Sequence, residues 1–286
     1  MSETNALPLP VARSVAALRR TVQAWRAAGL RVGFVPTMGA LHAGHLSLVD
    51  MARARADRVV VSIFVNPTQF GPNEDFGKYP RQEAADAARL AAFGVDLLYA
   101  PAVDEMYPAG AATTVKVGVV TERLEGVCRP GHFDGVATIV AKLLNQVQPH
   151  VAVFGEKDYQ QLLVVRRLAA DLDMDTDIVP GPTVREADGL AMSSRNAYLS
   201  DEDRAVAASL PSTLNFVATQ LRTGADAAPL LDAGRTRLLK AGFSEVQYLD
   251  LACATTLAPL EKADRPARLL VAAKVGATRL IDNVAV

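Results

Sequence analysis

The sequence predicts an α/β protein with a Rossmann-like parallel-sheet domain and a smaller C-terminal α+β domain. Between residues 31 and 172, short β-branched segments alternate with segments of helical periodicity, as in sheets built from strand–helix–strand units. After Pro180-Gly181-Pro182 the order changes to two helical segments followed by three strand-like ones. We therefore expect a first domain over residues 1–182 and a smaller lid domain over residues 183–286.

The first domain is expected to start with a helix, after which strands alternate with helices. Val11, Val15, Leu18, Val22 and Trp25 recur at helical spacing, and Gly29 follows as a C-cap. The run RVVVSIFV at 58–65 is almost entirely apolar, which is typical of a parallel strand buried on both faces. The remaining strands are expected at 31–36, 95–100 and 151–154, and the helices at about 41–56, 81–93, 135–147 and 158–172.

The second domain is expected to contain helices at 202–221 and 228–241 and strands at 246–251, 267–275 and 278–286.

Composition excludes several classes of protein. The 30 Lys and Arg residues balance 31 Asp and Glu residues, so no excess of positive charge favours binding to nucleic acid or to an anionic membrane. Residues 1–10 lack the pattern of a signal peptide, and the apolar run at 59–65 is far shorter than the ~20 residues of a membrane span. The two cysteines lack the spacing of a metal site or a disulfide framework. We expect a cytoplasmic protein.

Unusual polar residues follow three of the predicted strands, in the loops 37–45, 66–80 and 155–158. Parallel α/β sheets bind ligands beyond the carboxyl ends of their strands, so these loops are where we expect the site.

The first loop leads into His42-Ala43-Gly44-His45 at the start of a predicted helix. Two histidines three residues apart share one face, and backbone N–H groups at a helix start attract phosphate. Gly39 and Gly44 would let phosphate oxygens approach the backbone, and both imidazoles could donate to charge on phosphorus. Two alternatives remain open for this motif alone: surface or capping histidines, or a zinc site, although no third ligand pattern accompanies it.

Two further groups carry positive charge suited to phosphates. Gly155-Glu156-Lys157-Asp158 follows a strand and offers the Lys157 ammonium. Met192-Ser193-Ser194-Arg195 offers two hydroxyls and a guanidinium that could close over a triphosphate. Taken alone, each group could be an ordinary polar turn.

Amide side chains at Asn66 and Gln69, with Gln161 one turn into a later helix, could bind hydroxyl and carboxylate oxygens of a small substrate. The alternative for Asn66-Pro67 is a turn initiator.

These residues together resemble the pantothenate synthetase family along the whole chain. The segment from Pro36 to His45 (PTMGALHAGH) is similar to the family signature, with Ala43 where the familiar form has glutamate. Further blocks that resemble the family are Asn66-Pro67-Thr68-Gln69-Phe70, Asn73-Glu74-Asp75-Phe76, Tyr79-Pro80-Arg81, Arg129-Pro130-Gly131-His132-Phe133, Gly135-Val136, Phe154-Gly155-Glu156-Lys157-Asp158-Tyr159-Gln160-Gln161 and Ser193-Ser194-Arg195-Asn196.

The resemblance implies a homodimer that uses Mg-ATP to adenylate pantoate and then joins the pantoyl group to β-alanine. It implies His45 as proton donor, with His42, Lys157 and Arg195 also catalytic, and Gln69 and Gln161 as pantoate contacts, Gln69 also meeting β-alanine. Magnesium is expected on ATP oxygens and water, without a protein ligand. The implied ATP contacts are Met38, Gly39, Ala40, Leu41, His42, Ala43, Gly44, His45, Gly155, Glu156, Lys157, Asp158, Val184, Met192, Ser193, Ser194 and Arg195.

Two other functions fit parts of this pattern. Another nucleotidyltransferase with the same histidine motif would need a more basic acceptor pocket than the amide-rich loop 66–69 offers. A regulatory nucleotide-binding protein would share the fold without turnover, but the full set of His42, His45, Lys157 and Arg195 favours an enzyme.

Overall fold

The computed structural model describes residues 7–72 and 74–286, so the N-terminal residues 1–6 and Asn73 of the second family-like block lie outside the described residues. The chain divides into two compact units. Unit 1 comprises the residues up to Val117, Arg129–Glu156 and Val164–Gly181, and unit 2 comprises Gly118–Cys128, Lys157–Leu163 and Pro182–Val286. Two segments from the middle of the chain therefore group with the C-terminal residues. The domain boundary at residue 182 stays a prediction.

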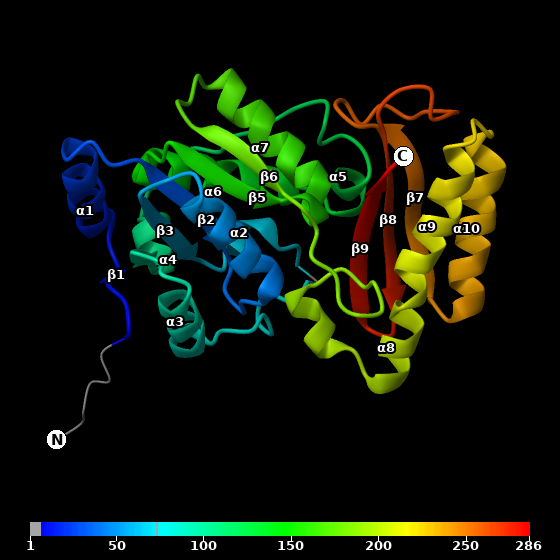
Figure 1. The fold of residues 1–286 in the computed structure, drawn as a ribbon, viewed down its shortest axis with the longest axis horizontal. Helices are drawn as coiled ribbons and strands as arrows, with labels where there is room; N and C mark the ends of the chain where they lie inside the picture. Colours follow the sequence, from blue (N-terminus) through cyan, green and yellow to red (C-terminus); the bar gives the residue numbers. More distant parts are fainter. Residues whose placement is uncertain (1–6, 73) are drawn as a thin grey trace. The chain divides into compact units, whose positions relative to one another are not determined.

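In the described part of unit 1, six parallel strands form one sheet in the order β1-β4-β3-β2-β5-β6 (Figure 1). This sheet confirms the predicted fold class, and β3 is buried along most of its length, as its apolar run indicated. The strands are β1 (Val11–Ala12), β2 (Val32–Thr37), β3 (Arg58–Ile63), β4 (Leu97–Tyr99), β5 (Val151–Gly155) and β6 (Asp177–Gly181).

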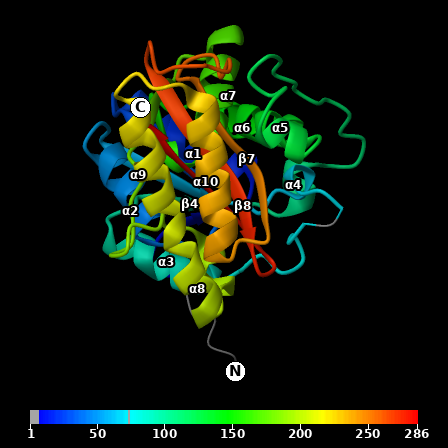
Figure 2. The same cartoon turned by 90° about the vertical axis from the view of Figure 1, so that its right-hand side faces the viewer.

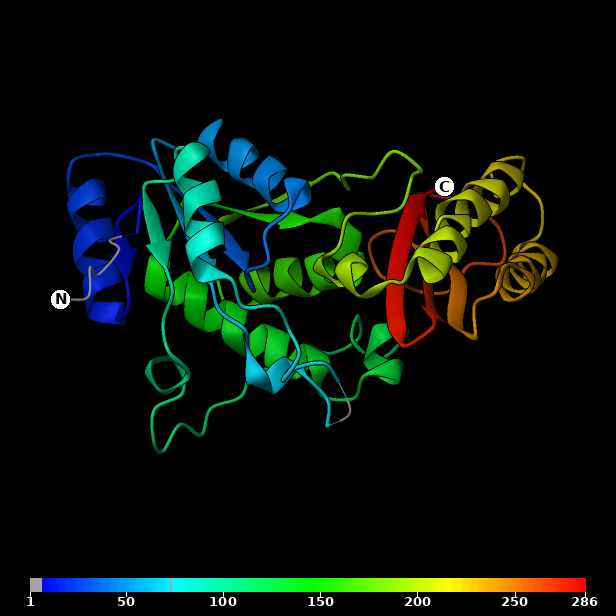
Figure 3. The ribbon, with the colours of Figure 1, turned by 90° about the horizontal axis from the view of Figure 1, so that it is seen from below.

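Helices cover both faces of this sheet. Figure 3 shows α2 and α6 on opposite sides of it, and both contact β2. Residues Val35, Val61, Leu98 and Val153 of four adjacent strands are fully buried in the core of unit 1. The helices are α1 (Val15–Ala27), α2 (Ala43–Arg53), α3 (Glu83–Ala92), α4 (Val103–Met106), α6 (His132–Val147) and α7 (Tyr159–Asp171), of which α7 contributes to both units.

Strand β2 lies at the centre of this topology. It pairs with β3 on one side and with β5 on the other, while the chain passes through β3 and β4 before returning to β5. Such a reversal of strand order opens a crevice at the carboxyl ends of the strands, where open α/β sheets bind ligands. The loops after β2, β3 and β5 therefore start from one edge of the sheet.

Unit 2 is built on an antiparallel sheet in the order β7-β8-β9. Figure 2 shows α9 and α10 side by side over this sheet. The two helices contact each other, α10 also contacts β7, and α9 also contacts β9. Its elements are α5 (Glu125–Cys128), the 3-10 helix η3 (Ser194–Tyr198), α8 (Asp201–Ala207), α9 (Ser209–Leu221), α10 (Ala227–Ala241), β7 (Glu245–Cys253), β8 (Ala267–Val275) and β9 (Thr278–Ala285).

Two local predictions were wrong, and one strand was not predicted. Val11 pairs with Leu98 in β1 instead of starting the first helix, which begins at Val15 after the Ser14 N-cap. The expected helix 202–221 is two helices, because Pro211 lacks an N–H and fits the first turn of α9 but not the middle of one long helix. Residues 177–181 form a strand despite Pro180, which an edge strand tolerates.

Candidate active site

The turn after β2 presents the first candidate residues. Gly39 and Ala40 both adopt the left-handed backbone conformation, with φ of 83° and 50°. A Cβ on Gly39 would also lie 3.1 Å from Ile63 Cγ2 and 3.2 Å from Asp86 Oδ2, so glycine is needed here for both reasons. The hydroxyl of Thr37 donates to the carbonyl of Ser62 at 2.7 Å and accepts from the N–H of Gly39 at 3.1 Å. The turn is thus fixed to the neighbouring strand β3.

A buried carboxylate on α3 fixes the rest of this turn. Asp86 has no exposed surface, and its two oxygens accept from the N–H groups of Ala40 at 2.8 Å and Leu41 at 2.9 Å. Arg89, also on α3, donates to the carbonyl oxygen of Leu41. Sequence analysis missed Asp86, since a lone acid within EAADAARLAA reads as an ordinary helical residue. Its complete burial at the turn gives it a positioning role.

The two histidines lie together at the start of α2. His42 is the N-cap, His45 stands in the first turn, and their ring centroids are 4.1 Å apart. The Nδ1 of His45 accepts from the backbone N–H of His42 at 3.4 Å. This contact uses the lone pair of Nδ1, so the proton of the neutral ring resides on Nε2, which becomes the donor. The prediction that both histidines share one helix start is confirmed.

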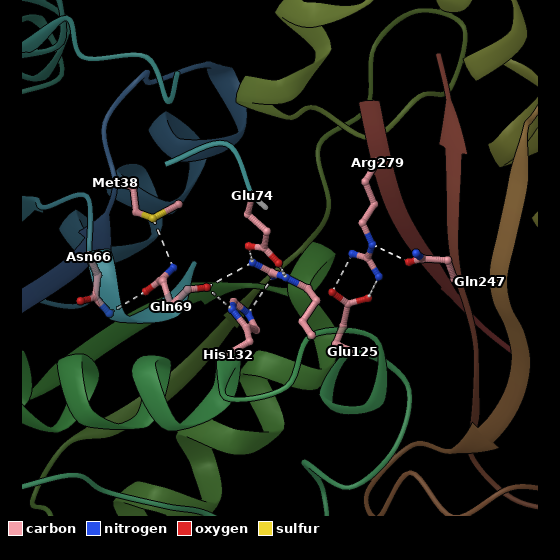
Figure 4. A network of polar contacts seen from close by, with 9 residues as sticks. Met38, Asn66, Gln69, Glu74, Glu125, His132, Gln247 and Arg279 are labelled. Carbon is pink, nitrogen blue, oxygen red and sulfur yellow. Dashed lines mark hydrogen bonds and ion pairs between the residues drawn. The ribbon is translucent and has the colours of Figure 1, made fainter. Parts of the chain in front are cut away.

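Gln69 connects the loop after β3 with the loop after β2. Its Oε1 accepts from Asn66 Nδ2 at 3.1 Å, and its Nε2 donates to Met38 Sδ at 3.2 Å. Figure 4 shows the amide directed toward Met38 on one side and Asn66 on the other. A thioether is a weak acceptor, so a carboxylate or hydroxyl oxygen could replace it with a stronger hydrogen bond. Gln69 therefore keeps a donor suited to an acid substrate.

Asn66 is used for structure. It is 1% exposed, and its Nδ2 donates to the carbonyl of Gly135 at 3.1 Å besides Gln69. Its Oδ1 accepts from Tyr107 OH at 2.8 Å and from the hydroxyl of Thr68 at 3.0 Å. The suggestion that the Asn66 amide binds substrate is therefore corrected: the side chain holds the loop that carries Gln69.

The block around Arg129 supports the same loop from α6. His132 Nδ1 donates to the carbonyl of Gln69 at 2.8 Å (Figure 4). Arg129 Nη2 donates to the same oxygen at 3.3 Å. Arg129 also pairs with Glu74, with Nε 2.7 Å from Oε1. Burial would raise the pKa of Glu74, but the hydrogen bond and charge of Arg129 lower it below its usual value. Glu74 therefore stays ionised near neutral pH.

In unit 2, Lys157 and Gln161 belong to a segment associated with β9. Asn283 of β9 donates from Nδ2 to the backbone carbonyl of Lys157 at 2.9 Å. Gln161 is half-buried on α7, next to the buried Gln160, whose Nε2 donates to the carbonyl of Val120 at 2.7 Å. Gly155 and Glu156, at the end of β5, belong to unit 1, so the block Gly155–Asp158 is divided between the units.

The remaining candidates follow a short hairpin in unit 2. Met192 N–H donates to the carbonyl of Val184 at 3.0 Å, which brings these two predicted ATP contacts together. Ser193 caps η3, because its Oγ accepts from the N–H of Arg195 at 3.3 Å. Ser194 and Arg195 form the first turn of η3 and are half-buried.

Within each unit, the structure brings predicted residues together in pairs: Met38 with Gln69 and His42 with His45 in unit 1, and Val184 with Met192 and Ser193 with Arg195 in unit 2. In the part of the chain that the structure describes, no group of three or more His, Cys, Asp or Glu side chains is arranged to hold a metal ion. No helix among the described residues is both long and apolar enough to cross a membrane.

The sequence of this chain is similar to those of known proteins. The model of the pantoate-β-alanine ligase family matches residues 10–285. The pantothenate synthetase of Paramagnetospirillum magneticum is 60% identical over 276 residues, which cover 96% of this chain and 97% of that protein. That of Rhodospirillum rubrum is 59% identical over 279 residues, covering 97% and 99%.

Solved structures agree. The crystal structure of pantothenate synthetase from Thermus thermophilus has a TM-score of 0.90 at 49% identity and covers 96% of this chain and 99% of that one. The pantoate-β-alanine ligase of Francisella tularensis, solved with β,γ-ATP and β-alanine, has a TM-score of 0.82 at 35% identity and covers 96% and 97%.

Proposed function

The chain belongs to the pantoate-β-alanine ligase family, and we propose how its own residues perform the reaction of that family. The enzyme joins pantoate to β-alanine at the expense of ATP and yields pantothenate, AMP and pyrophosphate. The observation that carries the proposal for the residues is the contact of Gln69 with Met38. It joins a loop suited to an acid with the turn that leads into a helix start suited to phosphate.

The reaction has two steps. A carboxylate oxygen of pantoate attacks the α-phosphorus of ATP, the bond from that phosphorus to the bridging oxygen breaks, and pyrophosphate leaves. The amine of β-alanine then attacks the acyl carbon of pantoyl adenylate, the bond to the phosphate oxygen breaks, and AMP leaves with loss of the amine proton. Neither step needs a protein nucleophile, so the protein contributes positioning and stabilisation of negative charge.

In unit 1, we assign the segment Met38–His45 to the ATP phosphates. The start of α2 supplies backbone N–H groups and the positive end of the helix dipole. His45 donates from Nε2 to the charge that develops during attack, because its Nδ1 is occupied by the N–H of His42. The packed His42 ring supports that orientation and is the second candidate donor.

Gln69 is assigned to pantoate and β-alanine, with Gln161 as a further pantoate contact. The support is that Gln69 has its carbonyl and its Oε1 fixed by neighbours, while its Nε2 meets only a weak thioether acceptor among its described contacts. An amide held in this way presents a directed donor to a carboxylate.

Lys157 and Arg195 are assigned to the phosphates as cations, along with the ATP contacts Gly155, Glu156, Asp158, Val184, Met192, Ser193 and Ser194. Lys157 is a mobile point charge, and Arg195 can donate two parallel hydrogen bonds to phosphate oxygens. Their support is the residue chemistry and the fixed backbone of both segments.

We further propose that Mg²⁺ enters as part of the nucleotide substrate, held by ATP oxygens and water. Magnesium usually keeps several waters and binds substrate phosphates, which suits a phosphate site built from N–H donors and cations. The family likeness also supports a homodimer, and the use of ATP supports a cytoplasmic location. Light scattering tests the dimer: a mass of one chain at micromolar protein would contradict it.

Pyrophosphate exchange tests the proposed function. With ATP, pantoate and Mg²⁺ present and β-alanine absent, labelled pyrophosphate should enter ATP, and the exchange should stop when pantoate is left out. A transfer through an acyl phosphate would release ADP and give no exchange. Full ligation with β-alanine but no pantoate-dependent exchange at high enzyme concentration would rule out reversible adenylation.

A further inference from the structure

Two adjacent polar residues lie buried near the end of β9. Asp282 is 2% exposed and Asn283 is 4% exposed, within the otherwise mostly apolar segment LIDNVA. Successive side chains of a strand point to opposite faces of the sheet, so the two residues serve different neighbours. Burying polar groups is costly unless each is hydrogen-bonded, which directs attention to their partners.

The partner of Asp282 is Arg185 in the hairpin before Met192. Arg185 donates from Nη1 to Asp282 Oδ2 at 2.7 Å and from Nη2 to Oδ1 at 2.9 Å. The same guanidinium donates to the carbonyls of Gly189 at 2.9 Å and Asn283 at 3.3 Å. One arginine therefore fixes both the turn of the hairpin and its attachment to β9.

The partner of Asn283 is the main chain of Lys157, whose carbonyl accepts from Asn283 Nδ2 at 2.9 Å. Arg279, four residues earlier and so on the same face of β9, pairs with Glu125 at 2.8 Å between Nη1 and Oε2 (Figure 4). These contacts join segments 118–128 and 157–163 to β9 within unit 2. Only the contact of Asn283 reaches a candidate phosphate ligand.

The geometry points to Asp282 and Asn283 as positioning residues that hold Lys157 and the Met192–Arg195 segment in one fixed frame for ATP. Neither side chain needs to touch the nucleotide. Through Asn283, β9 sets the backbone of Lys157; through Asp282 and Arg185, it sets the hairpin from which Ser193 to Arg195 continue. The inference rests on the proposed function, because it assumes that Lys157 and Arg195 bind phosphates.

Asn283→Ala is the first test, with initial-rate pantoate-dependent pyrophosphate exchange as the readout. Misplacing a binding group by about 1 Å can cost ~10²-fold in rate, so we expect a ten- to hundred-fold loss. In the ligation assay the KM for β-alanine should change little, because its assigned contact, Gln69, belongs to the other unit. Gln247→Ala is the matched control: it truncates an amide on the same sheet, one that accepts from Arg279 Nε at 2.7 Å, and should keep exchange.

A double-mutant cycle separates positioning from general stability. In a Lys157→Ala background there is no ammonium left to position, so Asn283→Ala should cost clearly less than it does in the wild type. A purely structural role would cost the same factor in both backgrounds. Equal factors, or wild-type exchange in a folded Asn283→Ala protein, would overturn the proposal.

Arg185→Lys provides a second route if Asn283→Ala does not fold. It keeps the charge beside Asp282, but its ammonium cannot reproduce the four contacts of the guanidinium. The loss of exchange should shrink in an Arg195→Ala background and persist in a Lys157→Ala background; the same loss in both would overturn the proposal. Wild-type exchange in Lys157→Ala alone would instead show that the role assigned to Lys157 is wrong.

Discussion

The two units place their candidate residues by different physical means. In unit 1, Met38, His45 and Gln69 follow adjacent parallel strands, and side chains of neighbouring elements, such as Asp86 and Asn66, fix the loops that carry them. In unit 2, Lys157 and the hairpin before Arg195 depend on side chains of the single strand β9. The comparison teaches that parallel topology brings the first set to one edge of the sheet, where side chains such as Asp86 then fix it, whereas in the second set buried polar pairs on one strand do both.

The largest expected effect belongs to unit 1, at His45. His45→Ala should fold normally and lose pantoate-dependent exchange by ~10²–10³-fold, the worth of one donor to transition-state charge. His45→Gln should retain more activity, because its Oε1 can accept from His42 N–H while its Nε2 donates.

The matched control for His45 is His150→Ala. His150 Nδ1 likewise accepts a backbone N–H, from Val32 at 2.9 Å, but at the amino end of β2. Exchange should survive this change. Near wild-type turnover of His45→Ala in a steady-state assay would end the catalytic assignment.

Asp86→Asn should lower pantoate-dependent exchange ten- to hundred-fold, as expected when a binding group is misplaced. Its amide can accept from only one of the N–H groups of Ala40 and Leu41, and its NH2 would face the other. Unfolding free energy should also fall by about 1–3 kcal/mol.

Asp50→Asn makes the same chemical change at an exposed site on α2 and should alter neither quantity. If Asp86→Asn kept full exchange, the turn would be fixed by topology alone and the contrast between the units would be sharper than we describe.

Gln69→Ala should raise the KM for pantoate and β-alanine by about tenfold or more, the worth of a hydrogen bond to a charged group. The KM for ATP should change little, because the start of α2 and its turn keep their own supports. Kinetics with each substrate varied in turn measures this difference. A defect confined to ATP would show that the acid pocket is misplaced.

The smallest expected effect is on the unfolding free energy at alkaline pH, where one buried tyrosine in each unit can be compared. Burial raises the pKa of Tyr99 in unit 1 to about 12 and raises the pKa of Tyr248 in unit 2 well above its usual value. A tyrosine whose pKa is raised in the folded state makes its full contribution to stability below the unfolded pKa of ~10. This contribution is lost as the pH rises above that value.

Stability should therefore fall above about pH 10 by up to ~1.4 kcal/mol per pH unit for each tyrosine. Tyr99→Phe and Tyr248→Phe should each flatten the profile measured by chemical denaturation between about pH 9 and pH 11. A profile that stays as steep as that of the wild type in both variants would contradict the assignment to these side chains.

Most of unit 1 could be predicted from the sequence. The apolar run of β3 and the glycines after β2 determine strand and turn locally, and the strand-end rule then places His45 and Gln69 at one edge. The short strand β1 escaped prediction, because Val11 continues the helical spacing of α1 and only its pairing with Leu98 reveals a strand.

The supports of the candidate residues could not be predicted. Asp86 and Asn283 take their roles from partners 46 and 126 residues away. A buried Asp-Asn pair in an apolar strand was the available signal at 282–283, and it indicates that polar partners exist without identifying them. Asn66 was misread for the same reason, since its partners Gly135 and Tyr107 come from other elements.

Transfer of a labelled oxygen is a direct test of carboxylate attack on the α-phosphorus. Pantoate labelled with heavy oxygen in both carboxylate positions is converted with ATP and β-alanine, and the masses of the products are measured by mass spectrometry. The account predicts that one labelled oxygen appears in the phosphate of AMP and the other stays in the amide carbonyl of pantothenate. Label in inorganic phosphate, or AMP without label, would contradict it.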